Sequence, residues 1–365
     1  MALKCGIIGI TNIGKTTIFN CISKTKAQTS NFAFSASKSN LGIVDVPDVR
    51  LDEISKIEKP EKTIYTTVEI VDIPGLAKGA SQGEGIGNKF LEDIQRSDAL
   101  IHVLRCFEDE NLPHIEGSIN PVRDMEIVDL ELQVKDLGMV EKKLARMEKL
   151  VKTGDKDAKK AVEVLKKYIA HFEDFKNARS IELSDTEKEI VDDVYLLTDK
   201  PAVYVCNVDE ASATTGNKYV EMVKEALKDD TAEVLIIAGA LEADISELET
   251  EEERLEFLED AGLSEPGVNR MIRAAYDLLN LQSYFTAGPK ECRAWTVKKG
   301  MNAQEAAGVI HSDLERGFIR AEVIKYEDYI SLGSEKAVKD AGKMHLEGKK
   351  YIVEDGDIMF IRFNV

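Results

Sequence analysis

Short apolar runs recur along the first two thirds of the chain, with longer stretches of helical spacing between most of them. The runs cover residues 3–8, 68–73, 99–106, 202–206 and 233–238. A run of four to eight apolar residues has the length of a buried strand. Strands that alternate with helices form a parallel sheet with helices on both faces. The pattern therefore predicts an α/β fold around a parallel-type sheet.

A second pattern interrupts this alternation between residues 128 and 178. Apolar residues recur every three or four positions on both sides of a break at Thr153–Asp155. They are Leu130, Val134, Leu137, Val140, Leu144, Met147 and Val151 before the break, and Ala158, Ala161, Leu165, Tyr168 or Ile169, Phe172 and Phe175 after it. Two antiparallel helices packed as a short coiled coil would bury both stripes. We call this predicted insertion the arm.

The pattern changes again near residue 281. Short strands are predicted at residues 292–297, 319–324 and 357–363, with one helix over 303–314 that Asn302 and Glu305 cap. This arrangement predicts a small sheet crossed by a helix. We therefore expect a nucleotide-binding domain over residues 1–280, with the arm inserted in it, and a second domain over residues 281–365.

The stretch from Gly9 to Thr17 carries the clearest chemistry. It contains the full G-x-x-x-x-G-K-[ST] motif between a predicted strand and a predicted helix, which is the context that the motif requires. Glycines let the loop turn its N–H groups inward, and the helix adds its positive N-terminal end, so phosphate oxygens are attracted. The residues expected to hold the phosphates are Asn12, Ile13, Gly14, Lys15, Thr16 and Thr17.

Metal binding and catalysis follow from the same motif. The Lys15 ammonium can reach the terminal phosphates, and the Thr16 hydroxyl is placed to bind the accompanying Mg²⁺. Asp72 and Gly75 end a predicted strand in an Asp-x-x-Gly sequence, and an acid at such a strand end is the second magnesium-side group of P-loop nucleotidases. We therefore assign Thr16 and Asp72 to the metal and Gly75 to the nucleotide.

Two segments are expected to respond to the γ-phosphate. Residues 31–40 form a polar loop where a first switch would lie, and residues 76–87 contain four glycines in a short span. Leu76 stands where Ras-like proteins have the glutamine that orients water, and an aliphatic side chain cannot do so. His114, in a loop after the strand ending at Cys106, is our candidate for positioning that water.

Residues 207–210 follow a strand where guanine-specific proteins show Asn-Lys-x-Asp. Asn207 is kept, but Val208 replaces the lysine and Glu210 replaces the aspartate. A carboxylate on a longer stem does not keep the two-hydrogen-bond geometry of the aspartate with guanine. We assign all three residues to the nucleotide, with ATP the expected substrate and GTP a further possibility.

Charge is unevenly spread over the 365 residues, which carry a net charge of −19. Residues 135–167 hold eleven Lys and Arg against six Asp and Glu, whereas residues 281–365 hold thirteen of each. An acidic body repels nucleic acid, so RNA is expected to bind the basic arm if it binds at all. The alternative is that the lysines of the arm only form a solvated helix face. With no signal peptide and no long apolar run, a cytoplasmic protein without a membrane partner is expected.

Several specific motifs are spread over essentially the whole chain. They are Lys4–Ile7, Asp72–Ser81, Gly83–Gly87, Arg105–Glu108, Asn207 with Glu210, Leu281–Gly288, Arg293–Thr296, Gly317–Ala321 and Phe363–Val365. Together they resemble one family, the Obg-like ATPases of the YchF type. The resemblance implies a nucleotide domain with a coiled-coil arm and a C-terminal ubiquitin-like TGS domain of the β-grasp type. It also implies slow hydrolysis of ATP beside GTP, and association with ribosomes.

The chain departs from the family pattern in the first switch, where Ala36 replaces the expected magnesium-binding threonine, and at Thr11, which replaces a proline in the phosphate loop. Two hypotheses follow. The chain is a cytosolic, Mg²⁺-dependent purine-nucleotide hydrolase that works as a slow switch on the ribosome, reached through the arm and the TGS domain. Alternatively, it is a binding module that holds nucleotide with little or no turnover.

Overall fold

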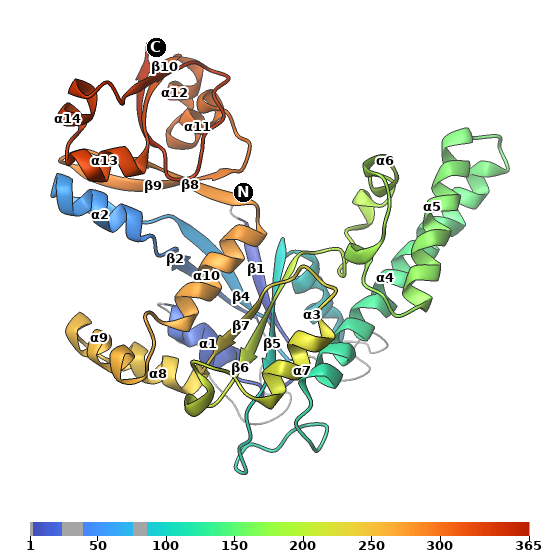
Figure 1. Cartoon of the computed structure of the whole chain (residues 1–365). Helices are drawn as coiled ribbons and strands as arrows, with labels where there is room; N and C mark the ends of the chain where they lie inside the picture. Colours follow the sequence, from blue (N-terminus) through green and yellow to red (C-terminus); the bar gives the residue numbers. More distant parts are fainter. Residues whose placement is uncertain (1–2, 24–38, 76–85, 365) are drawn as a thin grey trace. The chain divides into compact units, whose positions relative to one another are not determined.

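The computed structural model describes residues 3–23, 39–75 and 86–364 of the chain. They divide into two compact units. The first, which we call the nucleotide unit, takes residues 1–42 and 69–271, and the second, the C-terminal unit, takes residues 43–68 and 272–365 (Figure 1). The sequence did not predict that residues 43–68 join the C-terminal unit. The expected switch residues 31–38 and 76–85, Ala36 and Leu76 among them, lie outside the described residues.

A six-stranded sheet forms the centre of the nucleotide unit, in the order β2-β4-β1-β5-β6-β7. The strands are β1 (Lys4–Ile8), β2 (Asn40–Asp45), β4 (Thr67–Asp72), β5 (Ala99–Arg105), β6 (Ala202–Asn207) and β7 (Val234–Ile237). β1 pairs in parallel with β4 and β5, β5 with β6, and β6 with β7. The predicted parallel α/β fold is therefore confirmed. The carboxyl ends of β1, β4, β5, β6 and β7 share one edge of the sheet, where ligands of such folds bind.

Helices connect the strands of this unit (Figure 1). They are α1 (Lys15–Ile22), α3 (Ile86–Gln95), α4 (Pro121–Val151), α5 (Lys156–Glu173), α6 (Asp185–Lys188), α7 (Lys218–Ala226), α8 (Gly239–Glu247), α9 (Glu251–Asp260) and α10 (Gly267–Leu278). The helix α10 spans the point where the chain passes into the C-terminal unit. Among the described residues, no helix combines the length and the apolar character that crossing a bilayer demands.

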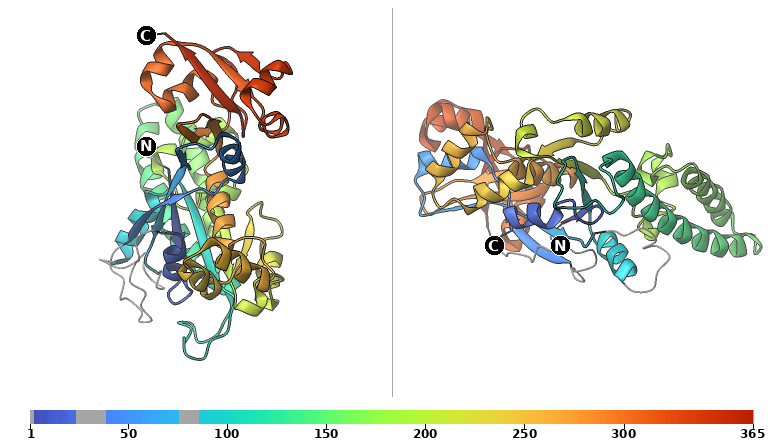
Figure 2. Two further views of the ribbon diagram at one scale, coloured as in Figure 1. Left: turned by 90° about the vertical axis from the view of Figure 1, so that its left-hand side faces the viewer. Right: turned by 90° about the horizontal axis from the view of Figure 1, so that it is seen from below.

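The arm consists of α4 and α5, which lie side by side (Figure 2). Asp155 caps α5 by accepting hydrogen bonds from two backbone N–H groups, and Val140, Leu165 and Tyr168 are fully buried between the elements of the arm. The predicted helix pair is confirmed.

Three residues of the predicted stripes are placed wrongly. Phe175 lies beyond the end of α5 and is 74% exposed. Leu130 is 43% exposed and Val134 is 40% exposed. The first half of α4 packs on β5 and α7 through other residues, Met125 among them, so the packing face there differs from the face that meets α5. The apolar spacing in the sequence therefore extends beyond the part of α4 that packs on α5.

Asp136 fixes the arm to the rest of the unit. Its fully buried carboxylate accepts hydrogen bonds from the Leu197 and Thr198 backbone N–H groups and from the Thr198 hydroxyl, at 2.6–2.8 Å. Burial raises the pKa of Asp136 to about 6, against the opposing effect of these hydrogen bonds. The arm is thus attached where the chain returns towards β6, and not only where it leaves β5.

The C-terminal unit is built on a second six-stranded sheet, in the order β11-β10-β12-β8-β9-β3. Its elements are α2 (Val49–Glu58), β3 (Lys62–Ile64), β8 (Leu281–Thr286), β9 (Glu291–Lys298), α11 (Ala303–Ile310), α12 (Ser312–Arg316), β10 (Phe318–Ile324), α13 (Tyr326–Leu332), α14 (Glu335–Asp340), β11 (His345–Glu347) and β12 (Ile358–Phe363). The predicted strands in 292–297, 319–324 and 357–363 are confirmed, whereas β8, β11 and the helices α13 and α14 were not predicted.

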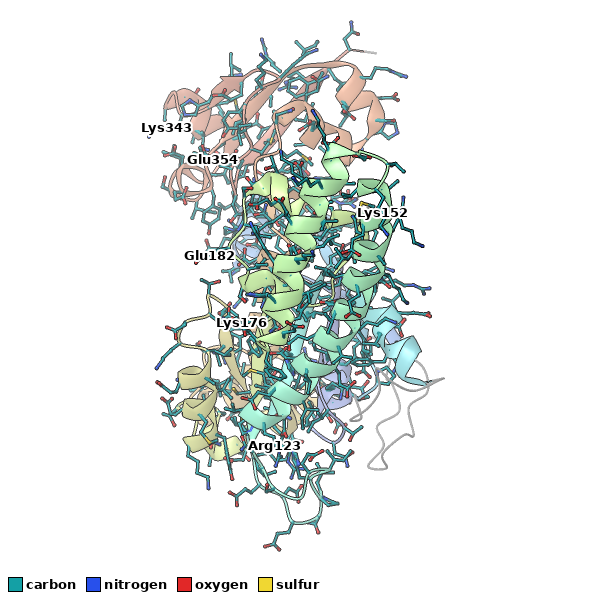
Figure 3. The ribbon with its side chains drawn as sticks, turned by 90° about the vertical axis from the view of Figure 1, so that its right-hand side faces the viewer. Arg123, Lys152, Lys176, Glu182, Lys343 and Glu354 are labelled. Carbon is teal, nitrogen blue, oxygen red and sulfur yellow. The ribbon has the colours of Figure 1, made fainter. Side chains whose placement is uncertain are left out.

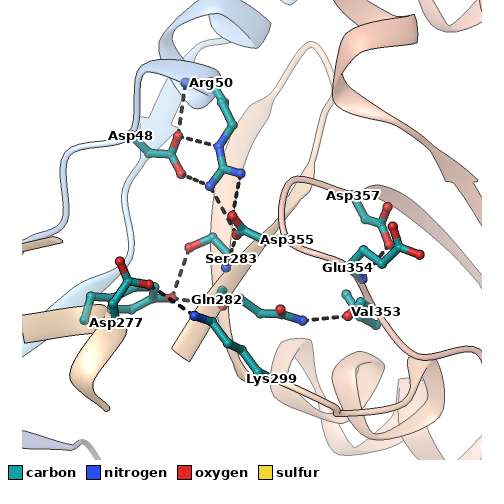
Figure 4. Close-up of polar contacts among 11 residues, drawn as sticks. Asp48, Arg50, Asp277, Gln282, Ser283, Lys299, Val353, Glu354, Asp355 and Asp357 are labelled. Atoms are coloured by element: carbon teal, nitrogen blue, oxygen red, sulfur yellow. Dashed lines mark hydrogen bonds and ion pairs between the residues drawn. The ribbon is translucent and has the colours of Figure 1, made fainter. Parts of the chain in front are cut away.

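Residues 43–68 belong to this unit for specific reasons. β3 pairs in parallel with β9, and Leu51 of α2 is fully buried in one core with Phe285. Figure 4 shows the Arg50 guanidinium between the carboxylates of Asp48 and Asp355, at 2.8–3.2 Å. The core contact and the ion pair between Arg50 and Asp355 hold together two segments more than 200 residues apart in sequence, which local periodicity cannot reveal.

The single helix predicted over residues 303–314 is wrong. Asn302 and Glu305 form the expected capping box at its start, but the backbone is extended at His311. The His311 ring accepts a hydrogen bond from the Asp313 N–H and caps a separate short helix, α12. The apolar spacing over residues 303–314 is the same whether His311 lies within one helix or caps a second one. The sequence pattern therefore did not show the break.

Candidate nucleotide-binding site

The loop between β1 and α1 has the backbone that the glycine motif predicts. Gly9, Asn12 and Gly14 have positive φ angles of 142°, 60° and 91°. A Cβ atom on Gly14 would lie 2.3 Å from the Asn207 side-chain nitrogen, so no larger residue fits there. Ile13 is buried, whereas Thr16 and Thr17 lie in the first turn of α1, whose N-terminal end adds a positive dipole to the loop. The loop is therefore shaped for phosphate.

Lys15 is held inside this loop. Its side chain is 6% exposed, and its ammonium donates a hydrogen bond to the Ile10 carbonyl at 2.6 Å. Burial lowers the pKa of Lys15 to about 8, and the nearby Asp72 carboxylate partly opposes this effect. A buried cation with one backbone partner has free donors for the oxygens of a phosphate.

Thr16 and Asp72, the two residues assigned to the metal, are in contact. The Thr16 hydroxyl donates to Asp72 Oδ2 at 2.9 Å, and the Asn40 amide donates to the same oxygen at 3.3 Å. Asp72 Oδ1 is buried and has no hydrogen-bond partner among the described residues. Burial raises the pKa of Asp72, while Lys15, Thr16 and Asn40 lower it. An unpaired carboxylate oxygen beside a hydroxyl fits Mg²⁺, which prefers oxygen ligands.

Asn207 braces the loop. Its side-chain nitrogen donates to the Ile13 carbonyl at 2.8 Å, and its side-chain oxygen accepts from the Gly239 N–H at 2.9 Å. Asn207 is 4% exposed, so both bonds are shielded from water. The amide thus joins the end of β6 to the phosphate loop and to the first residue of α8. We had assigned Asn207 to the nucleotide through the base, a contact that stays a prediction.

The other two residues of the base motif lie in different environments. Val208 is 2% exposed, packs in the core of the unit and donates its backbone N–H to the Ile237 carbonyl. Glu210 is exposed and begins a short 3₁₀ turn, which Asp209 caps. The Val208 side chain therefore supports the strand ends, whereas Glu210 presents a polar side chain to solvent.

His114 is engaged by neighbouring groups. Its Nε2 atom lies 2.8 Å from Asp124 Oδ2, and its Nδ1 atom accepts the Glu116 N–H at 3.1 Å. The imidazole is 3% exposed and the Asp124 side chain is 1% exposed. Because Nδ1 accepts, the proton of a neutral ring is on Nε2 and is donated to Asp124. The ring therefore joins the loop after β5 to the first turns of α4.

Three residues near the predicted site were missed or understated by the sequence. Asn40 contacts Asp72, and Gly239 contacts Asn207. A Cβ atom on Gly75 would lie 2.6 Å from the Thr11 side chain and 2.9 Å from its backbone nitrogen, so Gly75 closely approaches the loop. Gly239 could have been found, because it follows β7 at the same sheet edge as the other loops. Nothing in the local sequence marks Asn40.

Comparisons with known proteins identify the family of this chain. The family profile described as 50S ribosome-binding GTPase matches residues 4–167, and the profile for the C-terminal domain of YchF GTPases, described as a protein of unknown function, matches residues 281–364. The chain is 47% identical over 367 residues to the ribosome-binding ATPase YchF of Bacillus subtilis and 48% identical over 365 residues to that of Escherichia coli O157:H7, and each match covers 100% of both proteins.

A solved structure shows the same likeness. The YchF GTPase of Schizosaccharomyces pombe is 34% identical to this chain, with a TM-score of 0.86 that covers 99% of this chain and 98% of that one. This match confirms the predicted fold class, a P-loop domain with an inserted helical arm and a C-terminal TGS-like domain. Identity near one half over the full length of both chains, together with this fold, establishes that the chain belongs to the YchF family.

Proposed function

We propose that this chain is a slow nucleoside-triphosphate hydrolase, with ATP as substrate and GTP accepted beside it, that acts as a conformational switch on the ribosome. The contact between Thr16 and Asp72 next to the buried Lys15 ammonium carries the proposal, because a hydroxyl and a carboxylate beside a buried ammonium suit a metal ion and a phosphate. The curated relatives are named ribosome-binding ATPases, which supports the same activity and partner.

Magnesium is the cofactor that these residues suit. Thr16 and Asp72 would hold it, and when bound it would neutralise negative charge on the phosphates. The chain's own residues supply the remaining work. The loop N–H groups bind phosphate oxygens, Lys15 adds the positive charge that the transferred phosphoryl group requires, and Asn207 keeps the loop in place.

The base preference rests on residues 208 and 210. Val208 is buried in the core, and Glu210 has a longer stem than the aspartate of guanine-specific sites. Loss of one good pair of guanine contacts costs about 1–3 kcal/mol, or one to two decades of affinity. We therefore expect ATP to bind at least as well as GTP, and a titration in which GTP binds more than tenfold tighter would contradict this part of the proposal.

Turnover separates the proposal from its alternative. The rate of phosphate release is measured with ATP and with GTP, in the presence and absence of purified ribosomes, for the parent and for Asp72→Asn. Hydrolysis above the background, lost in the variant while stability is kept, supports an enzyme. Nucleotide binding without hydrolysis in any condition identifies the binding module instead.

The water-positioning role of His114 stays a prediction within this proposal. Both ring nitrogens are engaged, by Asp124 and by the Glu116 N–H. To orient a water, the ring has to give up one of these bonds, so the role requires a conformational step before hydrolysis.

The arm is the proposed contact with ribosomal RNA, together with the TGS domain. Its exposed lysines occur along both helices, and Lys152 lies next to the turn that joins them (Figure 3). Lys159 and Lys160 are exposed and form no ion pair with any described residue. Lys143, by contrast, is engaged by Asp193 and by the Ile190 carbonyl, so it contributes less to a basic surface. Phosphate contacts from such lysines would weaken with salt.

Charge reversal tests this surface. Lys159→Glu with Lys160→Glu is expected to weaken co-sedimentation with ribosomes and to reduce its salt dependence. The matched control is Lys224→Glu with Lys228→Glu, which makes the same charge change on α7 and just beyond its C-terminal end, outside the arm. Equal loss in both variants, or no loss in the arm variant, would show that the arm lysines only solvate a helix pair.

A further inference from the structure

The loop assigned to the first switch, residues 31–40, is described at its end, where Ser39 and Asn40 lie. Both side chains make polar contacts within the nucleotide unit, and neither has been given a role so far. Ala36 of the same loop stands where the family has a magnesium-binding threonine, and its side chain has no oxygen. At that position the loop therefore offers no side-chain ligand to a metal.

The Asn40 amide reaches one oxygen of the Asp72 carboxylate. Its Nδ2 atom donates to Asp72 Oδ2 at 3.3 Å, and the Thr16 hydroxyl donates to the same oxygen at 2.9 Å. A carboxylate only accepts hydrogen bonds, so the nitrogen of the amide faces it. The carboxylate torsion of an aspartate is soft, and two donors from different elements restrict its rotation. Asn40 therefore helps to orient Asp72.

Two contacts fix the place of Asn40 itself. Asn40 is the first residue of β2, which pairs with β4, the strand that ends at Asp72. Immediately before it, the Ser39 hydroxyl donates to the Asp93 carboxylate of α3. The amide thus reaches Asp72 from a backbone that is held on one side by strand pairing and on the other by α3.

A buried carboxylate needs donors for its own stability, and this need alone does not account for Asn40. Asp72 is 5% exposed, but Thr16 already donates to it, and the Lys15 ammonium lies near enough to favour its charged form. Asn40 is only half-buried and adds a longer bond to an oxygen that already has a donor. What this bond supplies is direction, which matters for a residue that binds a metal.

We propose that Asn40 is a positioning residue for the metal, which holds the Asp72 carboxylate in the orientation that binds Mg²⁺ together with Thr16. This inference rests on the proposed function, because it takes Thr16 and Asp72 as the metal-binding pair. The first switch thereby acts on the metal site through a hydrogen bond to a ligand. Asn40 does not touch the phosphates, so its loss weakens metal binding and leaves metal-free nucleotide binding unchanged.

The test measures the contribution of the metal to nucleotide affinity. Binding of adenylyl imidodiphosphate, an ATP analogue that resists hydrolysis, is followed by titration calorimetry in excess Mg²⁺ and in excess EDTA. The parent should bind more tightly with Mg²⁺. Asn40→Leu, which keeps the size of the side chain and removes the donor, should lower the ratio of the two affinities about three- to tenfold, the effect of one hydrogen bond. Its affinity in EDTA should stay within about twofold of the parent.

Three further variants complete the experiment. Asn217→Leu is the matched control, because it removes a half-buried amide that contacts neither Thr16 nor Asp72, and it should leave the ratio unchanged. Asn40→Ser is too short to reach Asp72 and should lower the ratio as Asn40→Leu does, so it decides the matter if the leucine variant does not fold. In an Asp72→Asn background, Asn40→Leu should cause no further loss, because it acts through the carboxylate.

The outcomes separate this inference from the proposed function. A parent that binds the analogue equally well with Mg²⁺ and with EDTA would overturn the metal assignment and this inference together. A parent that responds to Mg²⁺, with Asn40 variants that respond as strongly, would overturn this inference alone. The same conclusion follows if the Asn40 variants lose affinity equally in Mg²⁺ and in EDTA, or if Asn217→Leu lowers the ratio as much as they do, because the amide would then support only the fold.

Discussion

Removing the Asn207 side chain tests how the phosphate loop is held. Asn207→Ala eliminates two buried hydrogen bonds, one to the Ile13 carbonyl and one from the Gly239 N–H. Each leaves a backbone group without a partner in a region shielded from water, at a cost of about 1–3 kcal/mol. The free energy of unfolding should fall by about 2–6 kcal/mol, which corresponds to a melting temperature roughly 4–24 °C lower.

The same variant should weaken nucleotide binding. The Ile13 carbonyl belongs to the loop whose N–H groups face the phosphates, and without Asn207 that loop has to be ordered by the ligand. If ordering costs about 1–3 kcal/mol, the affinity for Mg²⁺-ATP falls about 5-fold to 150-fold. Titration calorimetry measures the affinity at a temperature where circular dichroism shows the variant folded.

Asn217→Ala provides the control for a general loss of stability. Asn217 caps α7 through the Tyr219 and Val220 N–H groups and donates to the Cys106 carbonyl at 2.7 Å, so it makes a comparable set of bonds. Its loss should lower stability while changing ATP affinity by less than about twofold. If Asn207→Ala binds ATP as the parent does, or if both variants lose the same affinity, then Asn207 does not act through the loop.

Two further outcomes follow from the same loop. Burial lowers the pKa of Lys15 to about 8, so Lys15 of the free protein loses its proton as the pH rises through that value. A bound phosphate keeps Lys15 protonated. ATP affinity should therefore fall by up to about tenfold per pH unit above about pH 8, and an affinity that titration calorimetry finds unchanged there contradicts the assignment. Gly14→Ala places a methyl group 2.3 Å from the Asn207 nitrogen at a φ of 91°, so ATP binding should be lost, and parent-like affinity would show that the loop adapts.

The sequence predicted the features that depend on local pattern. Apolar runs marked the parallel strands, the break at Thr153–Asp155 separated the two arm helices, and the glycine motif located Lys15 and Thr16. These predictions succeed because strand length, helical spacing and loop sterics are each set within a few residues. The contact between Thr16 and Asp72 was also within reach, since both follow neighbouring parallel strands at one sheet edge.

Long-range contacts were beyond the sequence. Residues 43–68 join the C-terminal unit through β3 and the ion pair of Arg50 with Asp355, and no local signal marks a partner some 300 residues away. Leu130 and Val134 kept the spacing of the arm stripe although the packing partner of α4 changes along its length. The sequence did not predict the hydrogen bonds of Asn207 to the phosphate loop and to α8 for another reason. A side-chain amide has donors and an acceptor that suit a nucleotide base and backbone groups equally well.

The bond between His114 and Asp124 sets a condition on any role of this histidine in hydrolysis. Freeing the ring leaves Asp124 Oδ2 buried without its donor, because the Arg123 guanidinium contacts the other oxygen. That release costs about 1–3 kcal/mol, so basal turnover through His114 would be about 5-fold to 150-fold slower than in a protein whose His114 ring is already free.

Asp124→Asn weakens the bond between residue 124 and His114 by removing the charge. Basal ATP turnover should therefore rise, by about tenfold for each 1.4 kcal/mol by which the release of the ring becomes less costly. His114→Ala should lower turnover with ATP affinity nearly unchanged, and the double variant should resemble it, because the gain depends on the ring. Turnover that does not respond to Asp124→Asn, or that survives His114→Ala with ribosomes present, would leave His114 only as the link between its loop and α4.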